Sequence, residues 1–110
     1  MGNPYYSQGL GAPVGKIVSN ALTGTDGTVA HVTSTNIPIT GVWVGADLGN
    51  TNHIVVGDSS CEATAGSIKG IILIPGNPSI FLPVNNLNLV YYDVVTTGDR
   101  ICFAYLQPYC

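Results

Sequence analysis

The fold is decided by residues 53–93, which read HIVVGDSSCEATAGSIKGIILIPGNPSIFLPVNNLNLVYYD. Four apolar runs alternate in this stretch with turn-forming pairs such as Pro75-Gly76 and Asn85-Asn86. Short runs rich in Val, Ile, Phe and Tyr, bounded by Gly, Pro, Asn and Asp, are typical of β-strands. The stretch therefore predicts strands at 53–56, 68–74, 79–84 and 87–93.

The rest of the chain shows the same pattern, with no window that has a clear apolar face at helical spacing. It predicts four further strands, at 14–22, 28–34, 37–44 and 100–106, with Asp26-Gly27 and Pro75-Gly76 as tight turns. Val, Ile and Thr supply 32 of the 110 residues, and β-branched side chains favour strands over helices. We predict an all-β protein, an antiparallel two-sheet β-sandwich of the jelly-roll kind, with an up-and-down barrel as the alternative.

The alternation of apolar side chains also predicts which residues face the core. One set of residues on each predicted strand shares a face: Ile80, Leu82 and Val84; Leu87, Leu89 and Tyr91; Ile101, Phe103 and Tyr105. The run at 68–74 is almost continuously apolar, so we expect a strand that is buried on both faces or closely covered. We expect Trp43 to pack at one end of the core.

Residues 1–15 form the first unit of the chain, ahead of a sandwich domain at 16–110. Four glycines and two prolines give this unit no periodicity, which indicates an extended arm. Tyr5, Tyr6 and Leu10 are its candidate anchors on a neighbouring protein, because tyrosine buries a large apolar area while its hydroxyl stays hydrated. A frayed terminus is the alternative.

Charged residues make up only 8% of the chain, and the formal net charge is −3. A surface this poor in charge is weakly protected against self-association, so we expect part of it to be covered by partner subunits. The three basic residues, Lys16, Lys69 and Arg100, lie far apart in the sequence, which argues against nucleic-acid binding. We also expect no membrane span and no Sec signal.

Three groups of residues were considered for chemistry, and each is better explained by local structure. Gly57-Asp58-Ser59-Ser60 resembles an esterase serine motif, but no histidine follows it in the chain. His31, His53 and Cys61 lack the close pairing of zinc ligands. Asp47, Asp58 and Glu62 lack the dense spacing of a calcium loop. We therefore expect no catalysis, no metal and no cofactor.

The cysteines, Cys61, Cys102 and Cys110, are odd in number. Without a secretory signal, such a set does not indicate a disulfide framework, and free thiols are expected. Cys102 falls within a strand pattern, which predicts a small buried or half-buried side chain.

The C-terminal half resembles small structural proteins of tailed bacteriophages. The resemblance rests on these segments: His53-Ile54-Val55-Val56-Gly57-Asp58, Gly70-Ile71-Ile72-Leu73-Ile74-Pro75-Gly76, Ile80-Phe81-Leu82-Pro83-Val84, Asn86-Leu87-Asn88-Leu89-Val90-Tyr91, Gly98-Asp99-Arg100-Ile101 and Ala104-Tyr105-Leu106. Similar domains occur in head decoration (cement) proteins, head fibres and tail-associated proteins.

The resemblance implies a non-enzymatic protein of the virion, made in the bacterial host cytoplasm. As a decoration protein it would sit on the outer capsid surface, bridge and stabilise major capsid protein subunits, and form a homo-oligomer, with a trimer favoured. The alternative is a tail- or head-fibre module that binds host glycan, for which Trp43, Tyr91, Tyr92 and Asn88 are the candidate contacts.

Overall fold

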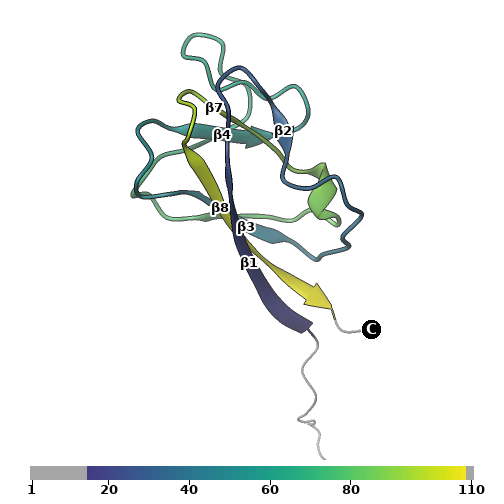
Figure 1. The fold of residues 1–110 in the computed structure, drawn as a ribbon. Helices are drawn as coiled ribbons and strands as arrows, with labels where there is room; N and C mark the ends of the chain where they lie inside the picture. The colour runs from purple at the N-terminus through teal and green to yellow at the C-terminus, as the bar shows by residue number, and fades with distance from the viewer. Residues whose placement is uncertain (1–14, 109–110) are drawn as a thin grey trace, which may run out of the picture.

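The computed structural model describes residues 15–108, which form eight strands and one turn of 3-10 helix (Figure 1). The elements in chain order are β1 (Gly15–Thr23), β2 (Ala30–His31), β3 (Val42–Ala46), β4 (Ile54–Gly57), β5 (Ile71–Leu73), β6 (Ile80–Leu82), η1 (Leu87–Leu89), β7 (Tyr91–Val94) and β8 (Arg100–Pro108). Gly15, which the sequence placed in the arm, is thus the first residue of β1.

The strands form two four-stranded sheets, with the orders β1-β8-β3-β6 and β2-β7-β4-β5. Every neighbouring pair is antiparallel. Four of the pairs lie one inside the other along the chain. From the ends of the chain to its middle, they are β1 with β8, β2 with β7, β3 with β6 and β4 with β5. This is the pairing of one long hairpin that has been folded over into two layers. The prediction of an all-β, antiparallel two-sheet sandwich is confirmed.

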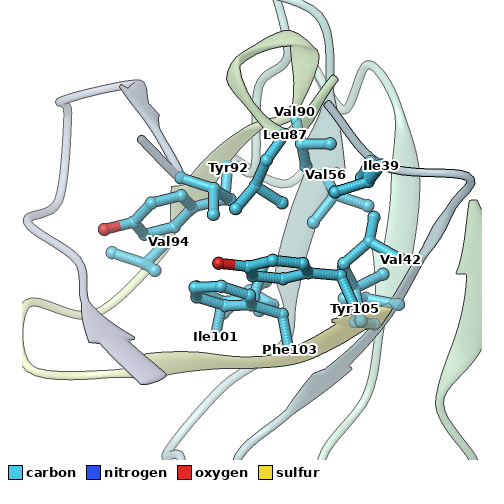
Figure 2. Packing of buried hydrophobic residues seen from close by; sticks show 14 residues of the cluster. Ile39, Val42, Val56, Leu87, Val90, Tyr92, Val94, Ile101, Phe103 and Tyr105 are labelled. Carbon is cyan, nitrogen blue, oxygen red and sulfur yellow. The ribbon is translucent and has the colours of Figure 1, made fainter. Parts of the chain in front are cut away.

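The core lies between the two sheets, where alternate side chains of each strand meet (Figure 2). β8 contributes Ile101, Phe103 and Tyr105, as predicted, and the rings of the last two stack with centroids 6.4 Å apart. Ile80, Leu82 and Val84 pack against the same core, also as predicted. The facing sheet supplies buried residues from β4, β5 and β7: Ile54, Val56, Leu73, Tyr92 and Val94.

Two turns have the conformation that their glycines predict. Gly27 and Gly76 have φ angles of 80° and 89°, which a side chain with a Cβ rarely adopts. The Thr28 N–H donates to the Thr25 carbonyl at 3.1 Å, and the Asn77 N–H donates to the Ile74 carbonyl at 3.0 Å. Both predicted turns are confirmed.

The prediction of one strand at 87–93 is wrong in its first half. Leu87–Leu89 forms the 3-10 turn, and only Tyr91–Val94 is a strand. The side chain of Asn86 caps this turn, since its Oδ1 accepts the N–H groups of Asn88 and of Ile37, each at 3.1 Å. A local side-chain acceptor of this kind competes with strand pairing. Leu87 is therefore buried and Leu89 exposed, so they do not share a face.

The predicted strands at 28–34 and 37–44 are shorter in the structure, where they are β2 and β3. Pro38 lacks an N–H group for a sheet ladder, and it makes only an isolated bridge to Asn86. Residues 37–39, which precede β3, instead form backbone hydrogen bonds with residues 85–87. The Leu87 N–H donates to the Ile37 carbonyl at 3.0 Å, and the Ile39 N–H donates to the Asn85 carbonyl at 3.2 Å.

The apolar run at 68–74 is not buried on both faces, as the sequence had predicted. Its strand β5 pairs only with β4 and therefore forms an edge of the sheet. Ile71, Ile72 and Ile74 are each exposed by nearly half, and only Leu73 is buried. A continuous apolar run can thus mark an edge strand as well as a central one.

Candidate interaction surface

The outer face of the β1-β8-β3-β6 sheet carries a row of large apolar side chains. We call these four residues the aromatic face: Ile17 (78% exposed), Trp43 (53%), Phe81 (46%) and Leu106 (39%). Strand alternation explains why Trp43 points outward, because Val42 and Val44 on either side of it point into the core. The prediction that Trp43 packs at one end of the core is therefore wrong.

The strand register brings the four side chains to neighbouring positions. Trp43 pairs with Phe81 on one side and with Ala104 on the other, and Ile17 pairs with Leu106. The rings of Trp43 and Phe81 lie 5.1 Å apart between centroids at a tilt of 54°. Tilted pairs at this distance are a favourable aromatic arrangement.

Gly41 shapes the aromatic face, because the ring of Phe81 lies against its backbone. A Cβ at position 41 would lie 2.1 Å from the Phe81 ring, so only glycine accommodates the ring in this place. On the other side of Trp43 its partner across the strands is Ala104, which also has a small side chain.

Two hollows flank Trp43. The larger has a volume of about 370 Å³ and is lined by the aromatic face together with Thr40, Gly41, Ala104 and Tyr105. The smaller has a volume of about 230 Å³, and Ser19, Asn20 and Ser79 contribute polar groups to its wall. No charged residue lines either hollow. The surface therefore suits an uncharged, largely apolar partner.

The opposite sheet differs, because the loop between β4 and β5 covers part of its outer face. Cys61 and Ala63 of this loop are buried against Val55 of β4. The Ala63 N–H donates to the buried Asp93 carboxylate at 2.8 Å, and the Ala63 carbonyl lies 2.9 Å from Nε2 of His53. The chain thus covers β4 itself, although Ile72 of the edge strand β5 stays exposed, whereas the described residues leave the aromatic face open.

Burial, with the carboxylates of Asp93 and Asp58 nearby, raises the pKa of the Cys61 thiol to about 11. A thiol of this pKa stays protonated near neutral pH, and the protonated form is a poor nucleophile. Cys61 and Cys102 are both free thiols, and Cys102 is half-buried, as predicted. Cys110 lies outside the described residues.

The residues considered for chemistry occupy separate places. His31 is exposed and packs on Tyr91 with ring centroids 4.1 Å apart, whereas His53 is held under the β4–β5 loop. Asp58 accepts the N–H and hydroxyl of Ser60, and these bonds lower its pKa. Among residues 15–108, no three His, Cys, Asp or Glu side chains are grouped so that they could hold a metal ion.

The structure does not bring the candidate glycan contacts together. Trp43 lies on the outer face of one sheet, whereas Tyr91 and Tyr92 belong to β7 of the other, and Tyr92 is buried in the core. The proposed anchors Tyr5, Tyr6 and Leu10 lie outside the described residues. Sequence reasoning missed Ile17, Phe81 and Leu106 as surface residues. Their signal was their position out of phase with the core-facing set, for example Phe81 between Ile80 and Leu82.

Comparison of the chain with protein-family models, with curated proteins and with solved structures found no match. No helix within residues 15–108 has the length and apolar character needed to cross a membrane.

Proposed function

We propose that this chain is a non-enzymatic structural protein of a tailed-bacteriophage virion, a decoration protein of the outer head surface. In this role it bridges and stabilises major capsid protein subunits, assembles as a homo-oligomer, with a trimer favoured, and is made in the host cytoplasm. The motif resemblance of the C-terminal half points to this class. The other arguments come from the strand order and from the surface.

The strand order supports the jelly-roll form of the sandwich. A jelly roll has eight strands in two sheets, built as two Greek keys, and is a common architecture of capsid proteins. It arises when a long hairpin with pairs one-eight, two-seven, three-six and four-five is wrapped into two layers. All four pairs occur here, and β8 with β3 and β7 with β4 join them into the two sheets.

The observation that carries the proposal is the open aromatic face of a domain that has few charged residues. Ile17, Trp43, Phe81 and Leu106 all border one hollow, so they form a single exposed patch rather than scattered apolar residues. Contiguous exposed apolar patches mark protein–protein interaction sites in soluble proteins. A buried aromatic anchor is worth about 2 kcal/mol or more on truncation. Repetition over a symmetric shell multiplies such a contribution.

Deleting residues 1–10 tests the part of the proposal that concerns the arm. We expect the truncated domain to remain folded, because the strands of both sheets and the cluster of buried residues between them lie within residues 15–108. We expect it to be lost from phage heads at lower temperature and on less dilution than the full-length protein, because the anchors Tyr5, Tyr6 and Leu10 are missing. The measurement is the amount of protein that sediments with heads after graded heating and dilution.

The control for this deletion is a full-length variant with Ser7→Ala and Gln8→Ala, which retains the three anchors. It should be retained on heads as well as the unaltered protein. If the truncated protein binds heads as tightly as the full-length protein, the arm does not contribute to binding.

One observation favours the alternative, a glycan-binding adhesion module. Trp43 stands beside the smaller hollow, where Ser19, Asn20 and Ser79 offer hydrogen-bonding groups next to an aromatic ring. Sugars are bound by such combinations of ring and polar groups. The number of copies per virion separates the two functions, because a shell protein repeats over the head and an adhesion module does not.

A further inference from the structure

We propose that the aromatic face is the docking site for the N-terminal segment, residues 1–14, of a second copy of this chain. The proposal deepens the homo-oligomeric assembly suggested above and rests on it. It assigns the two halves of the contact to named residues. The hollow formed by Ile17, Trp43, Phe81 and Leu106 receives Tyr5, Tyr6 and Leu10 of the neighbouring copy.

The chemistry of the two halves is complementary. Residues 1–14 read MGNPYYSQGLGAPV and contain no charged side chain, in keeping with a hollow that has no charged lining. A hollow of about 370 Å³ is large enough for aromatic side chains. Glycine stands on both sides of Leu10, at positions 9 and 11, so little side-chain bulk separates this part of the segment from the sheet. An uncharged segment also enters the hollow without the desolvation penalty of a buried charge.

The position of the segment brings it to this surface. β1 begins at Gly15, two residues before Ile17 of the aromatic face. Figure 1 shows β1 and β8 running together beyond the rest of the sandwich toward the chain termini. The β3 ladder on β8 ends at Tyr105, so β1 and the last residues of β8 project as a two-stranded ribbon. The segment therefore starts from a projecting ribbon at the border of the hollow.

The geometry favours a second copy over the chain's own hollow. Trp43 is level with Ser19 through Ala104, which places it about 13 Å along β1 from Gly15 and about 10 Å across two strands. Because β1 runs from Gly15 toward the level of Trp43, a segment that enters β1 at Gly15 has to reverse its direction to reach Trp43 of its own chain.

The chain's own anchors could reach Trp43 only through a turn ahead of Gly15. A neighbouring copy has no such restriction, because its segment can approach the hollow without a reversal.

The experiment uses Trp43 itself, which is the only tryptophan of the chain and therefore the only source of tryptophan fluorescence. Quenching of this fluorescence by acrylamide is measured for the full-length protein over a range of concentrations, with sedimentation analysis of the same samples. We expect quenching to be several-fold weaker at high concentration, where the protein is associated. On dilution to monomer, quenching should rise to the level of a variant that lacks residues 1–10.

A mixing experiment then identifies the donor of the segment. The Trp43→Ala variant has the segment but no tryptophan, so in a mixture with the truncated protein all tryptophan emission comes from the truncated protein. Adding the Trp43→Ala variant should protect that Trp43 from acrylamide, and adding Trp43→Ala with Tyr5→Ala and Tyr6→Ala should protect it much less. Leu48→Ala, which alters an even more exposed apolar side chain that lines neither hollow, is the control and should associate normally.

Two results would overturn the proposal. If full-length protein is monomeric and its Trp43 is protected at every dilution, the segment occupies the hollow of its own chain. If Trp43 is quenched equally in full-length and truncated protein at all concentrations, the segment does not bind the hollow, and the aromatic face serves another partner. No heads are present in these assays. Failure here is therefore distinct from failure of the protein to bind heads.

Discussion

Replacing Ile54 with alanine is expected to lower the free energy of unfolding by about 2–5 kcal/mol, the range for removing a large aliphatic side chain from a core. Ile54 has no exposed surface, and its strand β4 lies between β5 and β7. Its side chain belongs to the cluster between the sheets. The side chains around Ile54 belong to both sheets, so they cannot fill the cavity left by the substitution unless a strand moves.

The matched control for Ile54→Ala is Leu48→Ala, at a side chain that is 80% exposed in the loop after β3. Its effect should stay within about 0.5 kcal/mol, as for surface substitutions away from special features. Urea unfolding of both variants, followed by circular dichroism, measures the difference. A loss for Ile54→Ala no greater than for Leu48→Ala would contradict the two-layer packing described above.

Replacing Asp99 with alanine is expected to cost about 2–4 kcal/mol, because hydrogen bonds to a charged group are worth more than neutral ones and their loss strands buried donors. Asp99 is 4% exposed, at the start of β8. Its two carboxylate oxygens accept the backbone N–H groups of Thr51 and Asn52, each at 2.9 Å. The carboxylate thus holds the β3–β4 loop to the start of β8.

Two further variants, Asp99→Asn and Asp26→Ala, serve as comparisons for Asp99→Ala. Asp99→Asn keeps one acceptor oxygen and should cost less than Asp99→Ala. Asp26→Ala removes an exposed carboxylate and should have little effect. Thermal unfolding of the three variants, with amide hydrogen exchange at Thr51 and Asn52, measures the stability and the local change. If Asp99→Ala and Asp26→Ala are equally stable, the hydrogen bonds from Thr51 and Asn52 to Asp99 do not stabilise the fold.

The sequence predicted those parts of the fold that depend on local pattern. β8 alternates core and surface residues over its whole length, so both its position and its inner set Ile101, Phe103 and Tyr105 could be read directly. The turns at Gly27 and Gly76 were equally local. The class of fold followed, because these signals repeat at the spacing of a sandwich.

The parts that failed depend on contacts between distant residues. Asn86 turns the chain into a 3-10 helix partly because Ile37, far away in sequence, donates to its side chain. β5 became an edge because of the order of strands in the sheet, which no local pattern encodes. The buried carboxylate of Asp99 is matched by donors from a loop 47 and 48 residues away in sequence.

The candidate site shows the same division. Strand alternation places Trp43 on the face opposite to Val42 and Val44, whereas we had expected it at one end of the core. The sequence contained no indication that the β4–β5 loop covers β4 and that the described chain leaves the aromatic face open.

The number of copies per virion tests the central claim most directly, and quantitative mass spectrometry against the major capsid protein measures it. A decoration protein follows the symmetry of the shell. Decoration therefore predicts copies on the order of hundreds per particle, in a simple ratio to the major capsid protein. A count of only a few, or of a few dozen at a tail or fibre, would contradict the assignment to the head surface.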